Sequence, residues 1–288
     1  MSAESADPFE ISARPRQELL DATLADASGW RRFVAQNERL VLGMSGFIGV
    51  LLIWEFATRA GLIRAVFFSS PTAIAGAAWT LFSRGTIWED IGVSMEEFAL
   101  GFLSASILGI VVGVAAGWSR RINALASPWI AAWYATPHIA LIPLIVLWFG
   151  IGLSYKVFYV FLVAFFSVTI NAMVGVQSAE NRYLEVARSF GAGQRMQLRT
   201  VVLPAAVPYI MTGLRLGAGR AWVGVVVAEL VGANHGIGFM INLAGQMLNM
   251  SQAMFGIVLL GIFGIAIGEL MRRAERRFEV WRPQTRGG

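Results

Sequence analysis

The sequence predicts an all-α membrane protein with about six transmembrane helices. Of its 288 residues, 56% are hydrophobic and only 14% are charged, whereas an average soluble domain carries about 25% charged residues. The mean hydropathy is +0.62, and apolar runs of spanning length recur along the chain. A water-facing globule of this length could not bury so much apolar surface, so a lipid bilayer is the expected environment.

Composition also excludes several classes of protein. The chain has no cysteine, which rules out disulfides, thiolate metal sites and cysteine nucleophiles. The calculated pI of about 10.2 could indicate a nucleic-acid partner, but the excess base is almost all arginine at the ends of apolar runs. That pattern is typical of membrane orientation, and we expect no nucleic-acid partner. His138 and His235 are far apart in the sequence and lie beside no cluster of acids, so no metal site is expected.

We divide the chain into three parts. Residues 1–39 mix acids with arginines and lack the apolar core of a secretory signal, so they are expected to form a cytoplasmic extension. Residues 40–272 are expected to form a transmembrane domain, which contains a polar cytoplasmic loop at 178–204. Residues 273–288 are expected to form a cytoplasmic tail.

Six apolar runs approach the roughly 20 residues needed to cross the hydrocarbon core of a bilayer. They cover 40–58, 98–118, 125–149, 157–176, 209–231 and 255–271. In the second run, Gly109, Gly113 and Gly117 recur every fourth residue. This small-xxx-small ridge predicts that another helix backbone packs closely against that face.

Prolines indicate where helices begin or are disturbed. The third run contains Pro128, Pro137 and Pro143, so we expect it to be kinked, with neighbouring helices satisfying the freed carbonyls. In the long external segment after the first run, Ser70 and Pro71 have the positions of an N-cap and a first helical residue. A helix is therefore predicted to begin there.

The distribution of basic residues predicts the orientation. On the side of the membrane that holds the N-terminus, the loops and termini carry 17 of the 23 basic residues, and two more lie within the fifth run. The other side holds only Arg59, Arg64, Arg84 and Lys156. Because positive residues remain in the cytoplasm, both termini are predicted to be cytoplasmic.

One cytoplasmic loop has an unusual pattern. LEVARSFGAGQRMQLRTVVLP, residues 184–204, predicts helical segments at 184–190 and 194–200, joined at a GAG bend where glycine permits a sharp reversal. The pair is expected to lie along the cytoplasmic face and to present side chains to another molecule. An ordinary interfacial helix that anchors the loop is the alternative.

The spacing in this loop resembles the EAA loop of ATP-binding-cassette (ABC) importer permeases. Glu185-Val186-Ala187 is followed after three residues by Gly191 and after nine more by Val201-Val202-Leu203-Pro204. The family pattern is E-A-A, three residues, G, nine residues, I-x-L-P, so valine replaces one alanine and the isoleucine. Further segments resemble the nitrate, sulfonate and taurine branch of the family, and the resemblance covers roughly residues 40–272. These segments are 142–152, 171–177, 203–222 and 226–230.

The resemblance implies a type I importer permease (MetI-like) fold and a coupling role for the loop. Glu185 would be the charged contact to a separate ATPase, and Arg188 would pair with acids there or with membrane phosphates. Ala187 and Gly191 would keep the helix slim enough to dock, and Leu203 with Pro204 would begin the next element.

The resemblance also implies partners. The expected complex holds two copies of this chain, two ATPase subunits and an external solute-binding protein. The chain cannot be its own motor, since its single lysine, Lys156, follows Tyr155 and no P-loop is present. ATP and magnesium are therefore expected on the partner ATPase, with no cofactor and no catalytic residue on this chain.

Four polar residues inside the spans are candidates for a translocation path, because polar groups facing lipid are costly. Arg215 and Arg220 in the fifth run would attract an anion, although either could instead pair with a carboxylate. Thr169 and Asn171 in the fourth run could line the path, or each could bond to its own helix. His138 is expected to pack, and Glu229 to be an ordinary interface residue or, less readily, part of a gate.

The function that these observations favour is the membrane subunit of an importer in a bacterial inner membrane. The branch resemblance favours a small anion such as a sulfonate, nitrate, taurine or a small aromatic acid. The alternative is an ion-coupled secondary transporter or channel, which would need intramembrane acids or bases and leaves the EAA-like loop unexplained. A membrane enzyme is favoured least, because the sequence offers no set of groups for catalysis.

Overall fold

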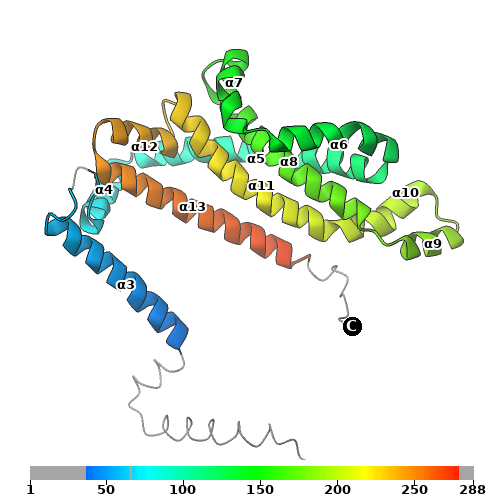
Figure 1. The fold of residues 1–288 in the computed structure, drawn as a ribbon, viewed down its shortest axis with the longest axis horizontal. Helices are drawn as coiled ribbons and strands as arrows, with labels where there is room; N and C mark the ends of the chain where they lie inside the picture. Colours follow the sequence, from blue (N-terminus) through cyan, green and yellow to red (C-terminus); the bar gives the residue numbers. More distant parts are fainter. Residues whose placement is uncertain (1–36, 65–66, 279–288) are drawn as a thin grey trace, which may run out of the picture. The chain divides into compact units, whose positions relative to one another are not determined.

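The computed structural model describes residues 37–64 and 67–278, and every regular element in those ranges is a helix (Figure 1). Most of the expected extension (1–39) and part of the expected tail (273–288) lie outside the described residues. The chain divides into two compact units, Met1–Arg64 and Ala65–Gly288. In the described part, five helices are long and apolar enough to cross a membrane, or six if one bent pair counts as a span. The predicted all-α fold is confirmed.

The first unit contributes one spanning helix, α3 (Glu38–Arg59). Its 22 residues would extend about 33 Å, which matches the hydrocarbon core of a bilayer. Its apolar side chains are largely exposed within the chain, as expected for a helix whose surroundings are lipid or another subunit. Near its end, Arg59 pairs with Glu55 one turn earlier, with Nε and Oε1 2.5 Å apart.

The core of the second unit is a layer of three long helices: α5 (Ile87–Trp118), α8 (Leu153–Gln177) and α11 (Leu203–Gly232). They run alongside one another, and α8 makes the most extensive contacts with the other two (Figure 1). The glycine ridge explains how α5 and α8 approach so closely. A Cβ atom at Gly113 would lie 2.5 Å from the Thr169 carbonyl oxygen, and one at Gly117 would lie 2.6 Å from Cβ of Val176. The predicted small-xxx-small packing is confirmed.

Three further helices flank this layer. α13 (Met250–Arg276) packs along α11, and the short α12 (Ile237–Gln246) joins α11 to α13. α4 (Pro71–Arg84) packs on α13. It begins as predicted, because Ser70 is its N-cap and the Ser70 hydroxyl accepts a hydrogen bond of 3.3 Å from the Ala73 N–H.

The third apolar run is broken, not merely kinked. α6 (Arg120–Ala135) ends before Pro137, and a short 3₁₀ helix, η1 (His138–Leu141), continues into α7 (Ile142–Phe149). The segment formed by η1 and α7 lies at 91° to α6. Proline lacks an N–H and keeps the preceding Thr136 out of helical geometry. The Thr136 hydroxyl compensates by donating to the Ala132 carbonyl at 2.8 Å. The expected kink is confirmed at Pro137, while Pro128 lies within α6 and Pro143 in the first turn of α7.

Candidate functional site

The loop between α8 and α11 folds into a helix–turn–helix at one end of the second unit (Figure 1). It contains α9 (Asn181–Ser189), α10 (Gln194–Gln197) and a π-helical turn, η2 (Leu198–Val202), that continues into α11. Gly191 ends α9 with φ +79°, a left-handed conformation that glycine adopts without strain. The Ala192 N–H donates to the Ala187 carbonyl at 2.9 Å and closes the turn. The predicted bent pair of helices is confirmed.

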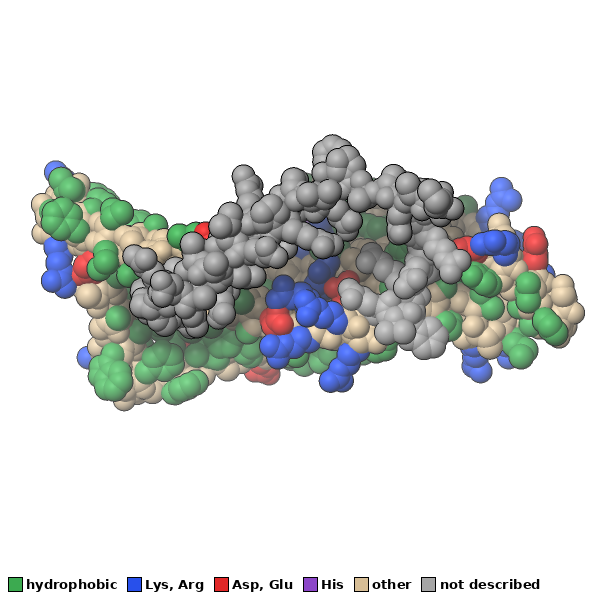
Figure 2. Space-filling view, turned by 90° about the horizontal axis from the view of Figure 1, so that it is seen from below, with side chains coloured by type: hydrophobic (Ala, Val, Ile, Leu, Met, Phe, Trp, Pro, Cys, Tyr) green, Lys and Arg blue, Asp and Glu red, His purple; other side chains and the backbone are tan. Residues whose placement is uncertain are grey.

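The surface of this helix–turn–helix is both charged and apolar. Glu185 and Arg188 are exposed on α9, and Glu185 makes no ion pair with any described residue. Phe190 is 87% exposed and Met196 60% exposed. Figure 2 shows basic and apolar side chains together at this end of the unit. Exposed apolar side chains rimmed by charges are typical of a surface that binds another protein.

A cavity of about 550 Å³ lies beside the broken span. α11 contributes Arg215 and Arg220 to its wall, η1 contributes His138, and α8 contributes Tyr159. The remaining lining is apolar apart from glycines: Ile139, Val163, Leu216, Gly219, Val223, Gly224 and Val227. The two arginines that the sequence singled out therefore share one cavity.

The two arginines differ in their partners. Nε of Arg215 lies 3.2 Å from Oε2 of Glu275 on α13, so Arg215 takes the carboxylate pairing that the sequence left open. Arg220 has no carboxylate partner among the described residues. Its Nη2 donates to the Tyr134 hydroxyl at 2.7 Å, and its guanidinium carbon lies 4.7 Å from the centre of the same ring. The partner of the Arg220 guanidinium is thus the phenol of Tyr134 and not a carboxylate.

The other two path candidates do not line this cavity. The Thr169 hydroxyl donates to the Phe165 carbonyl, and the Asn171 side-chain amide donates to the Ser167 carbonyl, each at 2.8 Å. Thr169 is fully buried where α8 packs on α5. Both therefore make the hydrogen bond to their own helix that was the alternative interpretation. His138 does more than pack, since it lines the cavity, although its Nε2 is buried without a partner among the described residues.

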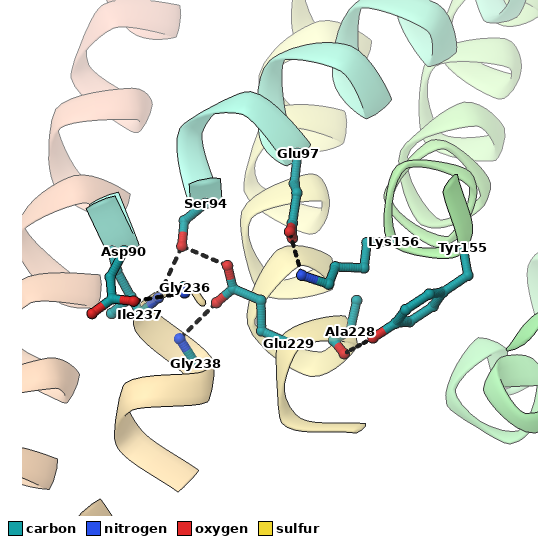
Figure 3. Close-up of polar contacts among 10 residues, drawn as sticks. All are labelled: Asp90, Ser94, Glu97, Tyr155, Lys156, Ala228, Glu229, Gly236, Ile237 and Gly238. Atoms are coloured by element: carbon teal, nitrogen blue, oxygen red, sulfur yellow. Dashed lines mark hydrogen bonds and ion pairs between the residues drawn. The ribbon is translucent and has the colours of Figure 1, made fainter. Parts of the chain in front are cut away.

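A buried polar cluster at the other end of α11 was not predicted (Figure 3). Glu229 accepts hydrogen bonds from the Ser94 hydroxyl at 2.5 Å and from the Gly238 N–H at 2.6 Å. The Ser94 oxygen in turn accepts from the Ile237 N–H at 3.0 Å. Asp90, one turn earlier on α5, accepts from the Gly236 N–H at 2.9 Å. Together these side chains satisfy the otherwise unpaired N–H groups at the start of α12.

The glycines at the start of α12 fit this arrangement. A Cβ atom at Gly236 would collide with the Glu229 carboxylate, and one at Gly238 would lie 2.9 Å from Oε2 of Glu229. Gly236 also has φ +123°, a backbone conformation that residues other than glycine rarely adopt. Glu229 is therefore not an ordinary interface residue. Its buried carboxylate fastens α12 to α5 and α11.

An ion pair between Glu97 on α5 and Lys156 on α8 lies next to this cluster (Figure 3). Nζ of Lys156 is 2.6 Å from Oε1 of Glu97, and both side chains are buried. The assignment of Lys156 to an external loop was therefore wrong, because α8 begins at Leu153. α5 likewise begins at Ile87, eleven residues before the predicted start at Phe98.

A helical pattern in the sequence could have revealed these residues. Asp90, Ser94, Glu97 and Gly101 are spaced as one face of a helix, and that face continues into the glycine ridge. Hydropathy placed Asp90, Ser94 and Glu97 outside the membrane because it does not consider whether a polar side chain has a hydrogen-bond or ion-pair partner. Buried polar groups persist where their partners are present, as they are here.

Closely packed spanning helices, a broken span and a projecting helix–turn–helix together define a polytopic membrane protein. The chain belongs to the family of binding-protein-dependent transport system inner membrane components, whose model matches residues 105–279. The expected ABC permease family is therefore confirmed.

Relatives and a solved structure agree with this assignment. The taurine transport system permease protein TauC of Escherichia coli (strain K12) is 32% identical over 88% of this chain and 93% of TauC. SsuC of Bacillus subtilis (strain 168), named as an aliphatic sulfonates transport permease protein, is 34% identical over 83% of this chain and 86% of SsuC. The fold is similar to a chain of the inward-facing MetNI methionine ABC transporter, with a TM-score of 0.57 at 20% identity over 67% of this chain and 97% of that one. That similarity confirms the predicted MetI-like fold.

Proposed function

We propose that this chain is the transmembrane permease of an ATP-driven importer for a small anionic solute such as a sulfonate, nitrate, taurine or a small aromatic acid. The observation that carries the proposal is the exposed helix–turn–helix at 181–202 in a chain of the binding-protein-dependent family. Relatives named for taurine, aliphatic sulfonate and bicarbonate transport support an anionic solute. In this proposal the chain supplies the path, and hydrolysis of ATP with magnesium takes place on a separate subunit.

The coupling surface in this proposal consists of the residues that match the EAA pattern. Glu185 and Arg188 are exposed on α9 and provide charges that fix the register on an ATPase. Ala187 accepts the hydrogen bond that closes the turn, and Gly191 supplies the left-handed bend. Leu203 and Pro204 begin α11, so movement of the docked turn passes directly into a helix that lines the cavity.

The complex in this proposal holds two permease copies, two ATPase subunits and a solute-binding protein outside the cell. The chain lies in the bacterial inner membrane, with the extension 1–39, the loop 178–204 and the tail 273–288 in the cytoplasm. Arg220, which has no carboxylate partner among the described residues, belongs to the anion path, whereas Arg215 lines the same cavity while paired with Glu275. Thr169 and Asn171 bond to their own helix and are assigned a packing role instead.

The buried acids Glu97 and Glu229 are the feature that would favour the alternative, an ion-coupled transporter. Each is already engaged, because Glu97 pairs with Lys156 and Glu229 accepts bonds from Ser94 and Gly238. Bonds of this kind support a structural role. Uptake driven by an ion gradient in the absence of any ATPase would favour the alternative.

The experiment that tests the proposal is reversal of the exposed charge on α9. Glu185→Arg is expected to abolish co-purification of the ATPase with a tagged permease and to remove ATP-dependent uptake, while membrane insertion is retained. Glu180→Arg is the matched control, since it makes the same charge change just before α9 and outside the EAA pattern. Normal ATPase binding and uptake by Glu185→Arg would contradict the coupling role.

A further inference from the structure

We propose that Arg220 binds the oxoanion group of the solute and that Tyr134 holds this arginine until the anion arrives, so that binding releases the hinge of the broken span. This inference rests on the proposed function and adds to it a named anion contact and a step at which the solute acts on the protein. The features that support it are the cavity, the guanidinium of Arg220, the phenol of Tyr134 and the break at Pro137.

The position of Arg220 is the first step. It is the eighteenth residue of the 30-residue α11, about 18 Å along the axis from the end at Gly232. A guanidinium at such depth in a membrane protein requires an acceptor or a water-filled cavity. The described residues offer it a cavity and one acceptor, the Tyr134 hydroxyl.

The second step is the number of donors that remain. A guanidinium has five N–H groups in a planar fork, and Tyr134 receives a bond from one of them. The fork fits two oxygen atoms of one carboxylate or sulfonate. Nη2 belongs to both of the two-nitrogen edges that can make such a bidentate contact. Nη2 carries one N–H on each of these edges, so an anion bound to the edge that Tyr134 occupies competes with the phenol for that N–H.

The third step connects Arg220 to the hinge. Tyr134 lies in the last turn of α6, three residues before Pro137. His138, directly after the break, lines the same cavity as Arg220. The contact between Arg220 and Tyr134 thus joins α11 to one side of the break, while the cavity touches the other side. An anion that replaces the phenol would remove the restraint on the angle between α6 and η1.

The cavity also indicates the class of solute. Its volume of about 550 Å³ is within the range of small-molecule sites. Apart from its arginines, His138 and Tyr159, the lining side chains are aliphatic. A fully hydrated inorganic ion would make few favourable contacts with these aliphatic side chains. The best fit is an organic anion that has one carboxylate or sulfonate group and a small apolar body.

The absence of cysteine from the sequence permits a direct test. Val223→Cys places the only thiol on the cavity wall, one turn after Arg220, at a side chain that is 62% exposed. The assembled complex in lipid nanodiscs is treated with two methanethiosulfonate reagents, the anionic sulfonatoethyl and the cationic trimethylammonioethyl compound. The expected result is a preference for the anion that falls roughly 10-fold when Arg220→Gln is added.

Protection of the same thiol tests the anion site and the role of Tyr134. Benzenesulfonate is expected to slow the reaction of the thiol in the Val223→Cys variant, whereas the uncharged methyl phenyl sulfone is not. Arg220→Gln should remove this protection, and Arg220→Lys should keep the charge preference but weaken protection because the fork is lost. Tyr134→Phe removes only the competing hydroxyl, so protection should occur at a several-fold lower concentration of benzenesulfonate.

The control thiol is Arg84→Cys in the last turn of α4, an exposed position outside both the cavity and the coupling surface, where Arg220→Gln should change neither rate. A thiol at position 223 that reacts with neither reagent, or a charge preference that survives Arg220→Gln, would overturn the anion site. Weaker protection in Tyr134→Phe would overturn the release of the hinge. Loss of ATP-driven uptake in Glu185→Arg has no bearing on these rates, so failure of the site is distinguishable from failure of the proposed function.

Discussion

Lys156 and Glu97 form an ion pair inside the membrane domain, with Nζ and Oε1 2.6 Å apart and both side chains buried. The pair joins α8 to α5 next to the residues that hold the start of α12 (Figure 3). Ion pairs in apolar surroundings cost desolvation energy when they form, but removal of one partner costs more because it leaves an isolated charge.

Lys156→Met is therefore expected to lower the stability of the permease by about 3–5 kcal/mol. The double variant Lys156→Met with Glu97→Leu removes both charges and should recover much of this loss. The measurement is the midpoint of thermal unfolding of the purified complex. Arg182→Ala is the control, because it breaks an exposed pair with Glu180 that is 2.8 Å long. If Lys156→Met and Arg182→Ala lowered the unfolding midpoint equally, the buried pair would contribute no more to stability than the exposed pair.

Ser94→Ala is expected to loosen the start of α12. The Ser94 oxygen is the acceptor for the Ile237 N–H and its hydroxyl is a donor to Glu229, so its removal leaves buried groups unpaired at a cost of about 1–3 kcal/mol. Hydrogen exchange at 236–238 should accelerate. Ser104→Ala on the same helix is the control, since the Ser104 hydroxyl bonds only to carbonyls of α5 itself. Unchanged exchange at 236–238 would mean that Glu229 holds α12 without Ser94.

Gly113→Ala is expected to separate α5 from α8 and to destabilise the fold. The added Cβ atom would lie 2.5 Å from the backbone oxygen of Thr169 and 2.7 Å from Cβ of Ala172, and neither position can yield without movement of a helix. Gly92→Ala on the same helix is the control, because a Cβ atom there has no neighbour within 4 Å. It should be neutral or stabilise α5 by up to about 1 kcal/mol. The unfolding midpoints of the two variants give the comparison.

Gly191→Ala is expected to weaken coupling more than Gly193→Ala does. An added Cβ atom meets no neighbour at either position, but Gly191 has φ +79° and Gly193 has φ −68°. Alanine at 191 would therefore strain the turn by roughly 1 kcal/mol. The measurement is ATP hydrolysis stimulated by the solute-loaded binding protein, at equal amounts of assembled complex. Equal activity in both variants would mean that the left-handed turn is not needed for docking.

Local patterns in the sequence were sufficient for much of this fold. The ridge of Gly109, Gly113 and Gly117, the start of α4 at Ser70 and the bend at Gly191 each follow from a short-range rule, and the structure has all three. Each of these features depends on backbone geometry or on neighbours within a turn or two. Such features are encoded locally and can be predicted without knowledge of the tertiary structure.

Features that depend on distant partners could not be predicted. Glu97 is separated from Lys156 by 59 positions and Ser94 from Glu229 by 135, so hydropathy assigned Lys156 to water. The choice between solute contact and ion pair for Arg215 depended on Glu275 in the last helix. For the same reason, only the tertiary structure shows that Arg220 is held by a phenol rather than by an acid.

The absence of a break between the exposed turn and the membrane interior has a mechanical consequence. Helical geometry continues from Gln194 through the π-helical turn to Gly232 without interruption. Arg220 lies 26 residues beyond Gln194 in this continuous segment, about 39 Å away at the usual helical rise. If Gln194 were the pivot, a tilt of about 10° would displace the guanidinium by about 7 Å, further than a hydrogen bond can stretch. Small angular movements at the exposed helix–turn–helix are thus large enough to decide whether Arg220 still reaches Tyr134.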